Sequence, residues 1–273
     1  MMIRMFAADL DGTLLGRKSK VSERTVETIN KLKKAGIFIV IASGRSKEEI
    51  MSLVSDFQLD MYDKAYLLPY NGALTIKADN MDIIKRTTLS NNDLSCIIGA
   101  IHDAGMFCHL YPETGLMVSD GLTEAQILGK EAMDGFTTIS KNLENIPAWA
   151  YKILVFDSKE KLDILRNGLP SEIEEKYGVF KSAPFLLEFS NKIATKGSAM
   201  KDLADSLGID QDQIIAFGDE ENDISLLNEA GLGVAMANAT DIVKKQADLI
   251  APSNEEDGVS RILEAILEGK EEI

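Results

Sequence analysis

Two stretches at opposite ends of the chain alternate short apolar runs with amphipathic helical segments, and this alternation restricts the fold most. Near the N-terminus, residues 3–10 and 37–42 form apolar runs of strand length, and the second is strongly β-branched. Between them, Ser22 is suited to cap a helix and Gly36 to end it. Because strands and helices alternate, the pattern predicts right-handed βαβ units and therefore a parallel sheet.

The C-terminal part of the chain resumes this alternation after a long interval. Gly208 and Gly231 fall where two predicted helices end. Both ends of the chain are therefore expected to contribute to one parallel sheet. We expect a helix over 196–207, a strand over 214–217, a helix over 222–230, strands over 232–236 and 248–251, and a helix over 258–267.

The stretch between these regions has a different pattern, in which strand-like segments are separated by turn residues and helices. The strand-like segments are 107–111, 116–119, 152–156 and 179–189, and the helical ones are 94–104, 124–133 and 161–176. We predict an α/β protein: a Rossmann-like, parallel-sheet core formed by residues 1–83 and 191–273, with an inserted α+β cap domain over 84–190 that covers the carboxyl edge of the core sheet.

Composition argues against several classes of function. The chain has 29 Lys and Arg against 44 Asp and Glu, a net charge of −15, which disfavours nucleic acid and anionic membranes as partners. Two cysteines and two histidines are too few for a four-cysteine zinc site or a histidine-rich metal site. No apolar run approaches the ~20 residues that span a bilayer, and the N-terminus does not resemble a signal peptide. We expect a soluble, cytoplasmic protein whose metal ligands would be carboxylates.

The segment 9–13, with the sequence DLDGT, lies where the first predicted strand ends. Open α/β sheets bind their ligands at this edge. A carboxylate such as Asp9 can attack phosphorus and form an aspartyl phosphate, and Asp11 can protonate the leaving oxygen and later deprotonate water. Gly12 permits the sharp turn that returns the second side chain to the site. The alternative interpretation is an acidic turn without catalysis.

Two further segments carry groups suited to binding phosphate. Ser43 and Gly44 follow the second predicted strand, and a hydroxyl with free N–H groups at a strand-to-helix junction can hold a phosphate oxygen. Lys196 begins a predicted helix, where its charge is unfavourable for the helix dipole but can neutralise Asp9 and a transferred phosphoryl group. Taken alone, Ser-Gly is ordinary loop chemistry and such a lysine is an ordinary surface residue.

Acidic residues also follow the strand predicted over 214–217. Asp219 lies at the end of the strand, and the residues that open the next helix include Asn222 and Asp223. Carboxylates in this position suit a hard cation such as Mg²⁺. Acidic groups also stabilise a helix N-terminus without any ligand. That simpler explanation fits Asp219 poorly, because Asp219 is expected at the same sheet edge as Asp9.

These segments converge at one edge of a parallel sheet, and with them the chain resembles the haloacid dehalogenase superfamily of aspartate-nucleophile phosphatases. The resemblance covers nearly the whole chain and is closest to the Cof-type sugar-phosphate phosphatase group, whose α+β cap is inserted where this chain has its insertion. Asn71-Gly72-Ala73 also matches a segment often found in that group. One departure is Ala237, where the group more often has Gly.

The resemblance implies a role for each of the residues singled out above. Asp9 is implied to be the nucleophile and a Mg²⁺ ligand, Asp11 the general acid and base that also gives the metal its backbone carbonyl, Asp219 the second metal carboxylate, Ser43, Gly44 and Lys196 binders of phosphate, Asn222 a contact to phosphate or substrate, and Asp223 an acid that orients Lys196 or the metal's waters.

We therefore expect a Mg²⁺-dependent phosphomonoester hydrolase that acts on small phosphorylated metabolites, sugar phosphates above all. Two alternatives remain open. A phosphomutase would use the same Asp9 and Asp11 but return the phosphoryl group to its sugar. A non-catalytic binding module for phosphorylated metabolites is the other alternative, although such a module need not keep Asp9, Asp11, Lys196 and Asp219 together. The sequence carries no signal for oligomeric state.

Overall fold

The structure is a computed structural model that describes residues 2–16, 20–113, 116–118, 139–140 and 146–269. The chain divides into two compact units, one formed by Met1–Arg86 with Thr195–Ile273 and the other by Thr87–Ala194. These divisions fall a few residues later than the expected ones at 84 and 190. The reason lies in two strands: Ile83–Arg86 pairs within the core sheet, and Leu186–Asn191 pairs within the sheet of the inserted unit.

Among the described residues of the core unit, eight strands form one sheet in the order β16-β15-β14-β1-β2-β3-β4-β5. Six of them are parallel: β1 (Met5–Asp9), β2 (Phe38–Ala42), β3 (Ala65–Leu68), β14 (Ile214–Gly218), β15 (Leu232–Met236) and β16 (Leu249–Ala251). The parallel sheet expected from the sequence is therefore confirmed for the strands that it named. The sheet is nevertheless mixed, because two strands that the sequence did not indicate continue it antiparallel at one edge: β4 (Leu74–Lys77) and β5 (Ile83–Arg86).

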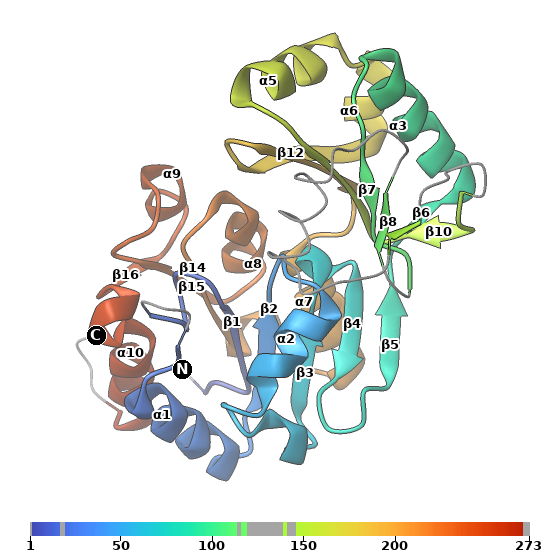
Figure 1. Ribbon diagram of the computed structural model, residues 1–273. Coiled ribbons are helices and arrows are strands. Elements are labelled where there is room, and N and C mark those ends of the chain that lie inside the picture. The colour runs from blue at the N-terminus through green and yellow to red at the C-terminus, as the bar shows by residue number, and fades with distance from the viewer. Residues whose placement is uncertain (1, 17–19, 114–115, 119–138, 141–145, 270–273) are drawn as a thin grey trace. The chain divides into compact units, whose positions relative to one another are not determined.

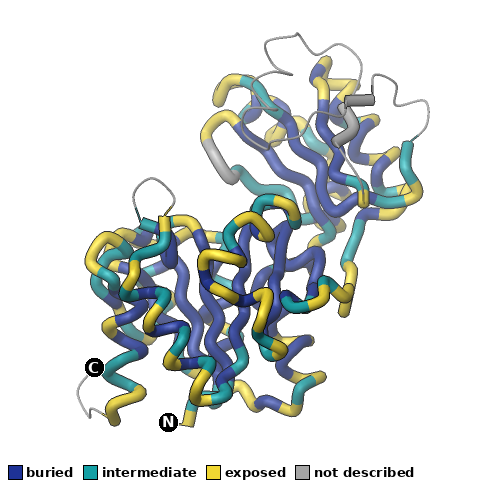
Figure 2. The backbone as a smooth tube through the Cα atoms, turned by 60° about the horizontal axis from the view of Figure 1, so that its bottom comes forward, coloured by how far each residue is buried: buried dark blue, intermediate teal, exposed yellow. Residues whose placement is uncertain are grey.

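Helices pack on the core sheet through alternate residues of its strands. On one face, Met5 and Ala7 of β1 share a hydrophobic cluster with Leu203 and Leu226, which belong to α7 (Lys196–Leu207) and α8 (Ile224–Asn228). Figure 2 shows the strands in the middle of the core unit as mostly buried, and every residue of β1 is buried. Helices α1 (Glu23–Lys34) and α10 (Gly258–Leu267) lie side by side (Figure 1). The remaining core helices are α2 (Lys47–Val54) and α9 (Asp241–Lys244).

Local capping chemistry sets several helix ends, although the helix expected to end at Gly231 ends earlier, at Asn228. Ser22 caps α1 by accepting the N–H of Thr25, and Ser46 and Glu49 form the reciprocal capping box of α2. Gly208 ends α7 in the left-handed conformation, with φ of 63°. The predictions for Ser22 and Gly208 were confirmed because each depends on residues close together in the sequence.

The inserted unit is an α+β domain with its own mixed sheet. Its six described strands follow the order β12-β13-β11-β7-β8-β9, and a separate pair joins β6 (Leu89–Ser90) to β10 (Trp149–Ala150). The strands of the larger sheet are β7 (His109–Leu110), β8 (Leu116–Val118), β9 (Ile139–Ser140), β11 (Lys152–Phe156), β12 (Tyr177–Ala183) and β13 (Leu186–Asn191), and the helices are α3 (Asn91–Asp103), α5 (Lys159–Gly168) and α6 (Ser171–Lys176).

Two segments of this unit differ from the sequence-based expectation, each at a proline. The stretch predicted as one strand over 179–189 is the hairpin of β12 and β13, with Pro184 in its turn. The stretch predicted as one helix over 161–176 is two helices, because Pro170 forces Leu169 into an extended conformation with ψ of 140°. The helix expected over 124–133 lies outside the described residues. No described helix combines the length and apolar character needed to cross a membrane.

Candidate active site

Strand register brings three of the predicted site segments to the same edge of the core sheet. Asp9, the last residue of β1, pairs with Ala42 of β2, so Ser43 follows directly beside it. On the other side, Ala8 pairs with Phe217 of β14, so Asp219 follows at the same level. Parallel strands end together, and their carboxyl ends therefore place these side chains near one another.

A buried lysine joins two of the carboxylates. Lys196 is the first residue of α7, and its side chain is only 1% exposed. Its Nζ donates to Asp9 Oδ1 at 2.6 Å and to Asp223 Oδ1 at 2.5 Å. Burial disfavours the charge of this lysine, but Asp223 and Asp9 outweigh that effect and raise its pKa. Lys196 is therefore a positive charge fixed beside Asp9, and not the surface residue that the sequence also allowed.

Burial disfavours the ionised form of the Asp9 carboxyl group. Burial raises the pKa of Asp9 well above its ordinary value; Lys196 opposes this shift, and the negative charge of Asp223 adds to it. The site thus concentrates negative charge where Asp9 ends the strand. A cation in addition to Lys196 would lower the free energy of keeping Asp9 ionised.

Asp223 links the side chain of Lys196 to the backbone that follows β14. Its Oδ1 accepts from Lys196, and its Oδ2 accepts the backbone N–H groups of Asp219 at 2.9 Å and Glu220 at 3.0 Å. Gly218 makes this approach possible, because a Cβ there would lie 2.3 Å from the Cβ of Asp223. Asp223 therefore fixes both the lysine and the segment that carries Asp219.

Asp219 is held by the loop that follows Asp9. Thr13 donates its hydroxyl to Asp219 Oδ1 at 2.7 Å. Burial raises the pKa of Asp219 to about 7, although the hydrogen bond from Thr13 acts in the opposite direction. Gly12 has φ of 81°, and a Cβ on it would lie 2.1 Å from Asp219 Oδ2. Only glycine fits this position, for reasons of both backbone conformation and space.

Three acidic residues of the site lie close enough together to hold a metal ion. Carboxylate oxygens of Asp9, Asp219 and Asp223 lie within 4.8 Å of one another, the only such group found among the described residues. Both oxygens of Asp223 are already engaged by Lys196 and by backbone N–H groups. Asp9 and Asp219 each have one oxygen outside the contacts described above. A pair of buried carboxylates suits a hard cation such as Mg²⁺.

The second acid of the DLDGT segment points elsewhere. Asp11 has a side chain that is 50% exposed, and Arg45 binds it with two hydrogen bonds: Nε to Oδ2 at 2.7 Å and Nη2 to Oδ1 at 2.6 Å. Sequence reasoning gave Arg45 no role. The available signal was its position directly after Ser43 and Gly44, at the edge where Asp11 was expected. The carboxylate of Asp11 thus lies outside the acidic cluster that contains Asp9.

The predicted phosphate-binding residues gather around Asn71. Asn222 donates its Nδ2 to Asn71 Oδ1 at 2.9 Å, and a Cβ on Gly44 would lie 3.2 Å from the same oxygen. Ser43 is buried, and its Oγ accepts the backbone N–H of Arg45 at 3.2 Å. The segment match at 71–73 therefore marks a structural neighbour of the site, with Asn71 in the left-handed region at φ of 56°.

Comparison with known proteins agrees with this fold. A family model described as haloacid dehalogenase-like hydrolase matches residues 6–263, and the chain belongs to that family. The resemblance to Cof-type phosphatases seen in the sequence is thereby confirmed. That resemblance was based on the DLDGT segment, on the segments that contain Ser43, Lys196 and Asp219, and on the position of the inserted unit.

Relatives of known sequence or structure align along almost the entire chain. Phosphatase YwpJ of Bacillus subtilis is 30% identical, over 97% of this chain and 100% of its own. A 5-amino-6-(5-phospho-D-ribitylamino)uracil phosphatase, YcsE of the same organism, is 27% identical over 96% of this chain and 94% of its own. A haloacid dehalogenase-like hydrolase from Bacteroides thetaiotaomicron has a crystal structure with a TM-score of 0.85 and 28% identity, covering 97% of this chain and 99% of that one. The protein is a phosphatase.

The space beside Gly12 gives a first prediction. Gly12→Ala places a Cβ against the Asp219 carboxylate, and its left-handed backbone costs an alanine about 1–2 kcal/mol. We expect loss of phosphatase activity together with lower stability, measured by phosphate release and by urea unfolding. Gly208→Ala is the matched control, because it has the same backbone strain and no atom within 4 Å of the added Cβ. If Gly12→Ala and Gly208→Ala lose the same stability and both keep their phosphatase activity, the close contact of residue 12 with Asp219 is not needed for activity.

Proposed function

We propose that this phosphatase is a Mg²⁺-dependent phosphomonoester hydrolase that acts on small phosphorylated metabolites, sugar phosphates above all, through an aspartyl phosphate on Asp9. The observation that carries the proposal is the buried contact of 2.6 Å between Lys196 and Asp9 at the end of β1, with Asp219 beside it. A fixed positive charge next to a strand-end carboxylate suits transfer of a phosphoryl dianion.

The relatives support the proposed substrate class. The name of the relative YcsE specifies a phosphate ester on a ribityl chain, which is a small phosphorylated molecule of sugar-like structure. For this chain, we infer a substrate of the same chemical type, a phosphate monoester of a small polyhydroxylated alcohol or sugar.

The first chemical step uses Asp9 and Asp11. A carboxylate oxygen of Asp9 attacks phosphorus, the bond from phosphorus to the ester oxygen breaks, and Asp11 gives its proton to the departing alkoxide. Lys196 keeps Asp9 in place and balances negative charge on the phosphoryl group. Ser43, Gly44 and Asn222 are proposed to hold the remaining phosphoryl oxygens.

The second step returns the enzyme to its starting state. Asp11 takes a proton from water, the resulting hydroxide attacks phosphorus, and the bond to Asp9 breaks to release inorganic phosphate. In both steps Asp11 has to reach the reacting oxygen. Its carboxylate is bound to Arg45 in the structure, so that pair has to separate or shift when substrate is present.

The carboxylates fit a role for Mg²⁺ at the same place. Asp9, Asp219 and the backbone carbonyl of Asp11 would hold the ion, which when bound supplies positive charge that reduces repulsion between Asp9 and the phosphate dianion. Asp223, whose oxygens are occupied, keeps Lys196 and the Asp219 backbone in position. Thr13 orients the carboxylate of Asp219.

A screen of phosphorylated sugars and p-nitrophenyl phosphate tests the proposal. We expect phosphate release from several sugar phosphates, and we expect Asp11→Asn to reduce kcat/KM about 100-fold or more on those alkyl esters. The loss on p-nitrophenyl phosphate should be smaller, because its leaving group needs less protonation. Asp56→Asn, a change at an exposed aspartate of the core, is the control.

Three results would count against parts of the proposed reaction. Absence of phosphate release from every ester tested would contradict hydrolysis of small phosphate esters. Transfer of phosphate between positions of one sugar, with little net release of phosphate, would favour a phosphomutase instead. If Asp11→Asn lowers kcat/KM equally on alkyl and aryl esters, Asp11 is not the general acid.

A further inference from the structure

The loop that follows β15 contacts both the segment that carries Asp9 and Asp11 and the segment that carries Asp219. Asn238 donates its Nδ2 to the backbone carbonyl of Gly12 at 2.8 Å. The backbone N–H of Thr240 donates to the carbonyl of Asp219 at 3.1 Å. One short loop, which connects β15 to α9, therefore ties together the turn after Asp9 and the end of β14. No role was expected for Asn238 from the sequence.

The side chain of Asn238 is itself held in a defined orientation. Its Oδ1 accepts the backbone N–H of Asn254 at 3.1 Å, so its Nδ2 is the atom that faces Gly12. Asn254 in turn donates its own Nδ2 to the carbonyl of Leu15 at 2.7 Å. Two asparagines linked to each other thus hold the carbonyls of Gly12 and Leu15, which lie three positions apart on this turn.

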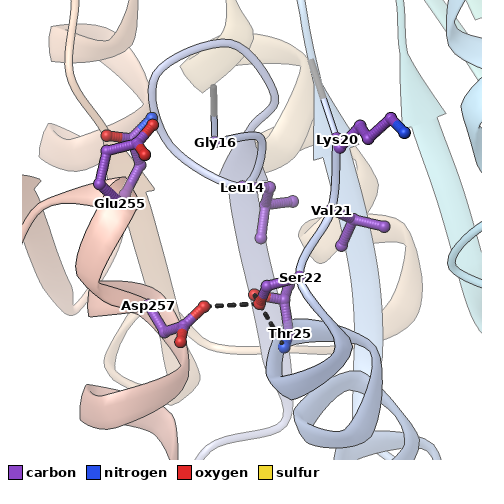
Figure 3. A pocket seen from close by; sticks show the side chains of 9 residues that line it. Leu14, Gly16, Lys20, Val21, Ser22, Thr25, Glu255 and Asp257 are labelled. Carbon is purple, nitrogen blue, oxygen red and sulfur yellow. Dashed lines mark hydrogen bonds between the residues drawn. The ribbon is translucent and has the colours of Figure 1, made fainter. Parts of the chain in front are cut away.

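The Gly12 carbonyl is a separate point of contact on this turn, whose neighbouring side chains are held by the hydrogen bond of Thr13 to Asp219 and by the binding of Asp11 to Arg45. The N–H groups of Leu14 and Leu15 both return to the carbonyl of Leu10, which closes the turn but leaves the Gly12 peptide outside it. Beside this segment lies a cavity of about 210 Å³, bordered by Leu14 and Gly16 (Figure 3). Rotation of the peptide after Gly12 would move Asp11 on one side and Thr13 on the other.

We propose that Asn238 is a positioning residue for the phosphatase reaction. Its amide fixes the carbonyl of Gly12 and thereby holds the turn that carries Asp11, so that the Asp11 carboxyl can reach the leaving oxygen once Arg45 releases it. This inference rests on the proposed function, since it assigns Asn238 an effect through Asp11. Asn238 is an exposed residue, so its hydrogen bond is expected to contribute more to the geometry of the turn than to the stability of the fold.

Asn238→Leu and Asn238→Ala test the inference, the first with similar side-chain size and the second with minimal bulk. For a sugar phosphate found in the screen, we expect kcat/KM to fall about fivefold to tenfold, as loss of one hydrogen bond implies. For p-nitrophenyl phosphate the fall should be about twofold or less, because that leaving group depends less on Asp11. The readout is kcat/KM for the sugar phosphate divided by kcat/KM for p-nitrophenyl phosphate. A general loss of folded protein lowers both values equally and leaves this ratio unchanged.

Asn228→Ala is the matched control. Asn228 is an exposed asparagine of α8 whose side chain makes no hydrogen bond to the described residues, and its replacement should leave the ratio unchanged. Thermal unfolding of all variants checks that each is folded. If either Asn238 variant is unfolded at the assay temperature, so that its hydrogen bond supports the fold and not the turn alone, the inference is overturned.

The wild type and Asp11→Asn separate failure of this inference from failure of the proposed function. If Asp11→Asn lowers the ratio and both Asn238 variants leave it unchanged, Asn238 does not act through Asp11 and the inference alone is wrong. If the wild type releases no phosphate from either ester, or Asp11→Asn leaves the ratio unchanged, the proposed reaction fails and the role of Asn238 falls with it. A lowered ratio in Asp11→Asn and in both Asn238 variants supports the inference.

Discussion

Asp9→Asn is expected to reduce phosphate release by about 10⁴-fold or more, as removal of a catalytic nucleophile does in other enzymes. An amide oxygen is a poor nucleophile toward phosphorus, whereas it can still accept the hydrogen bond that Lys196 now gives to Asp9. The fold should therefore persist. Burial already disfavours the charge of Asp9, so loss of that charge is not expected to destabilise the core.

Mass spectrometry of acid-quenched enzyme gives a second readout for the same variant. The wild type mixed with substrate should carry one phosphoryl group on the peptide that contains Asp9, and Asp9→Asn should carry none. Asp56→Asn serves again as the control, with unchanged turnover. Turnover near that of the wild type in Asp9→Asn, or a phosphoryl group on another residue, would show that Asp9 is not the nucleophile.

Removal of divalent metal is expected to have the second largest effect. EDTA should lower activity at least ~100-fold and Mg²⁺ should restore it, because a bound cation contributes several kcal/mol of charge stabilisation. Mg²⁺ should also stabilise the fold, by about 2.7 kcal/mol at a concentration hundredfold above its Kd. Asp219→Asn should abolish that stabilisation, measured as a shift in Tm, and Asp212→Asn, at an exposed residue, should keep it.

The affinity for Mg²⁺ should also depend on pH in a definite direction. Burial raises the pKa of Asp219 to about 7, so in the absence of metal this carboxyl is largely protonated below that pH. A proton and a cation compete for the same oxygens, and the Kd for Mg²⁺ should therefore fall as the pH rises from 6 to 8. Isothermal titration calorimetry measures this directly. Metal-independent activity, or a Kd that does not change with pH, would contradict the assignment of Asp219.

The parts of the structure that could be predicted from the sequence are those fixed by nearby residues. Ser22 and Gly208 set helix ends through contacts within a few residues of themselves, and both were placed correctly. The convergence of Asp9 and Asp219 could be predicted as well, because both follow buried apolar runs and parallel strands end at one edge. A place for Lys196 beside Asp9 was expected only once these segments were considered together, because such a lysine taken alone is an ordinary surface residue.

Other features depend on contacts that no local pattern records. All residues of β5 are exposed, including Ile83 and Ile84, so burial against the core does not define this strand, and its pairing with β4 does. The pair of Asp11 with Arg45 joins residues 34 positions apart, and the hydrogen bond of Asn238 to Gly12 joins residues 226 positions apart. Such contacts involve ordinary polar side chains in loops, whose partners are fixed only when the strands have assembled.

The interruption of the core by the inserted unit has a consequence for biosynthesis. Strand β1 lies between β2 and β14, and Asp9 and Lys196 are 187 positions apart. While the ribosome is still translating the insertion, one edge of β1 has no partner and can pair with a strand of another nascent chain. Slow translation or scarcity of chaperones during that interval should therefore lower the yield of soluble enzyme more than it would for a protein whose sheet forms from consecutive strands.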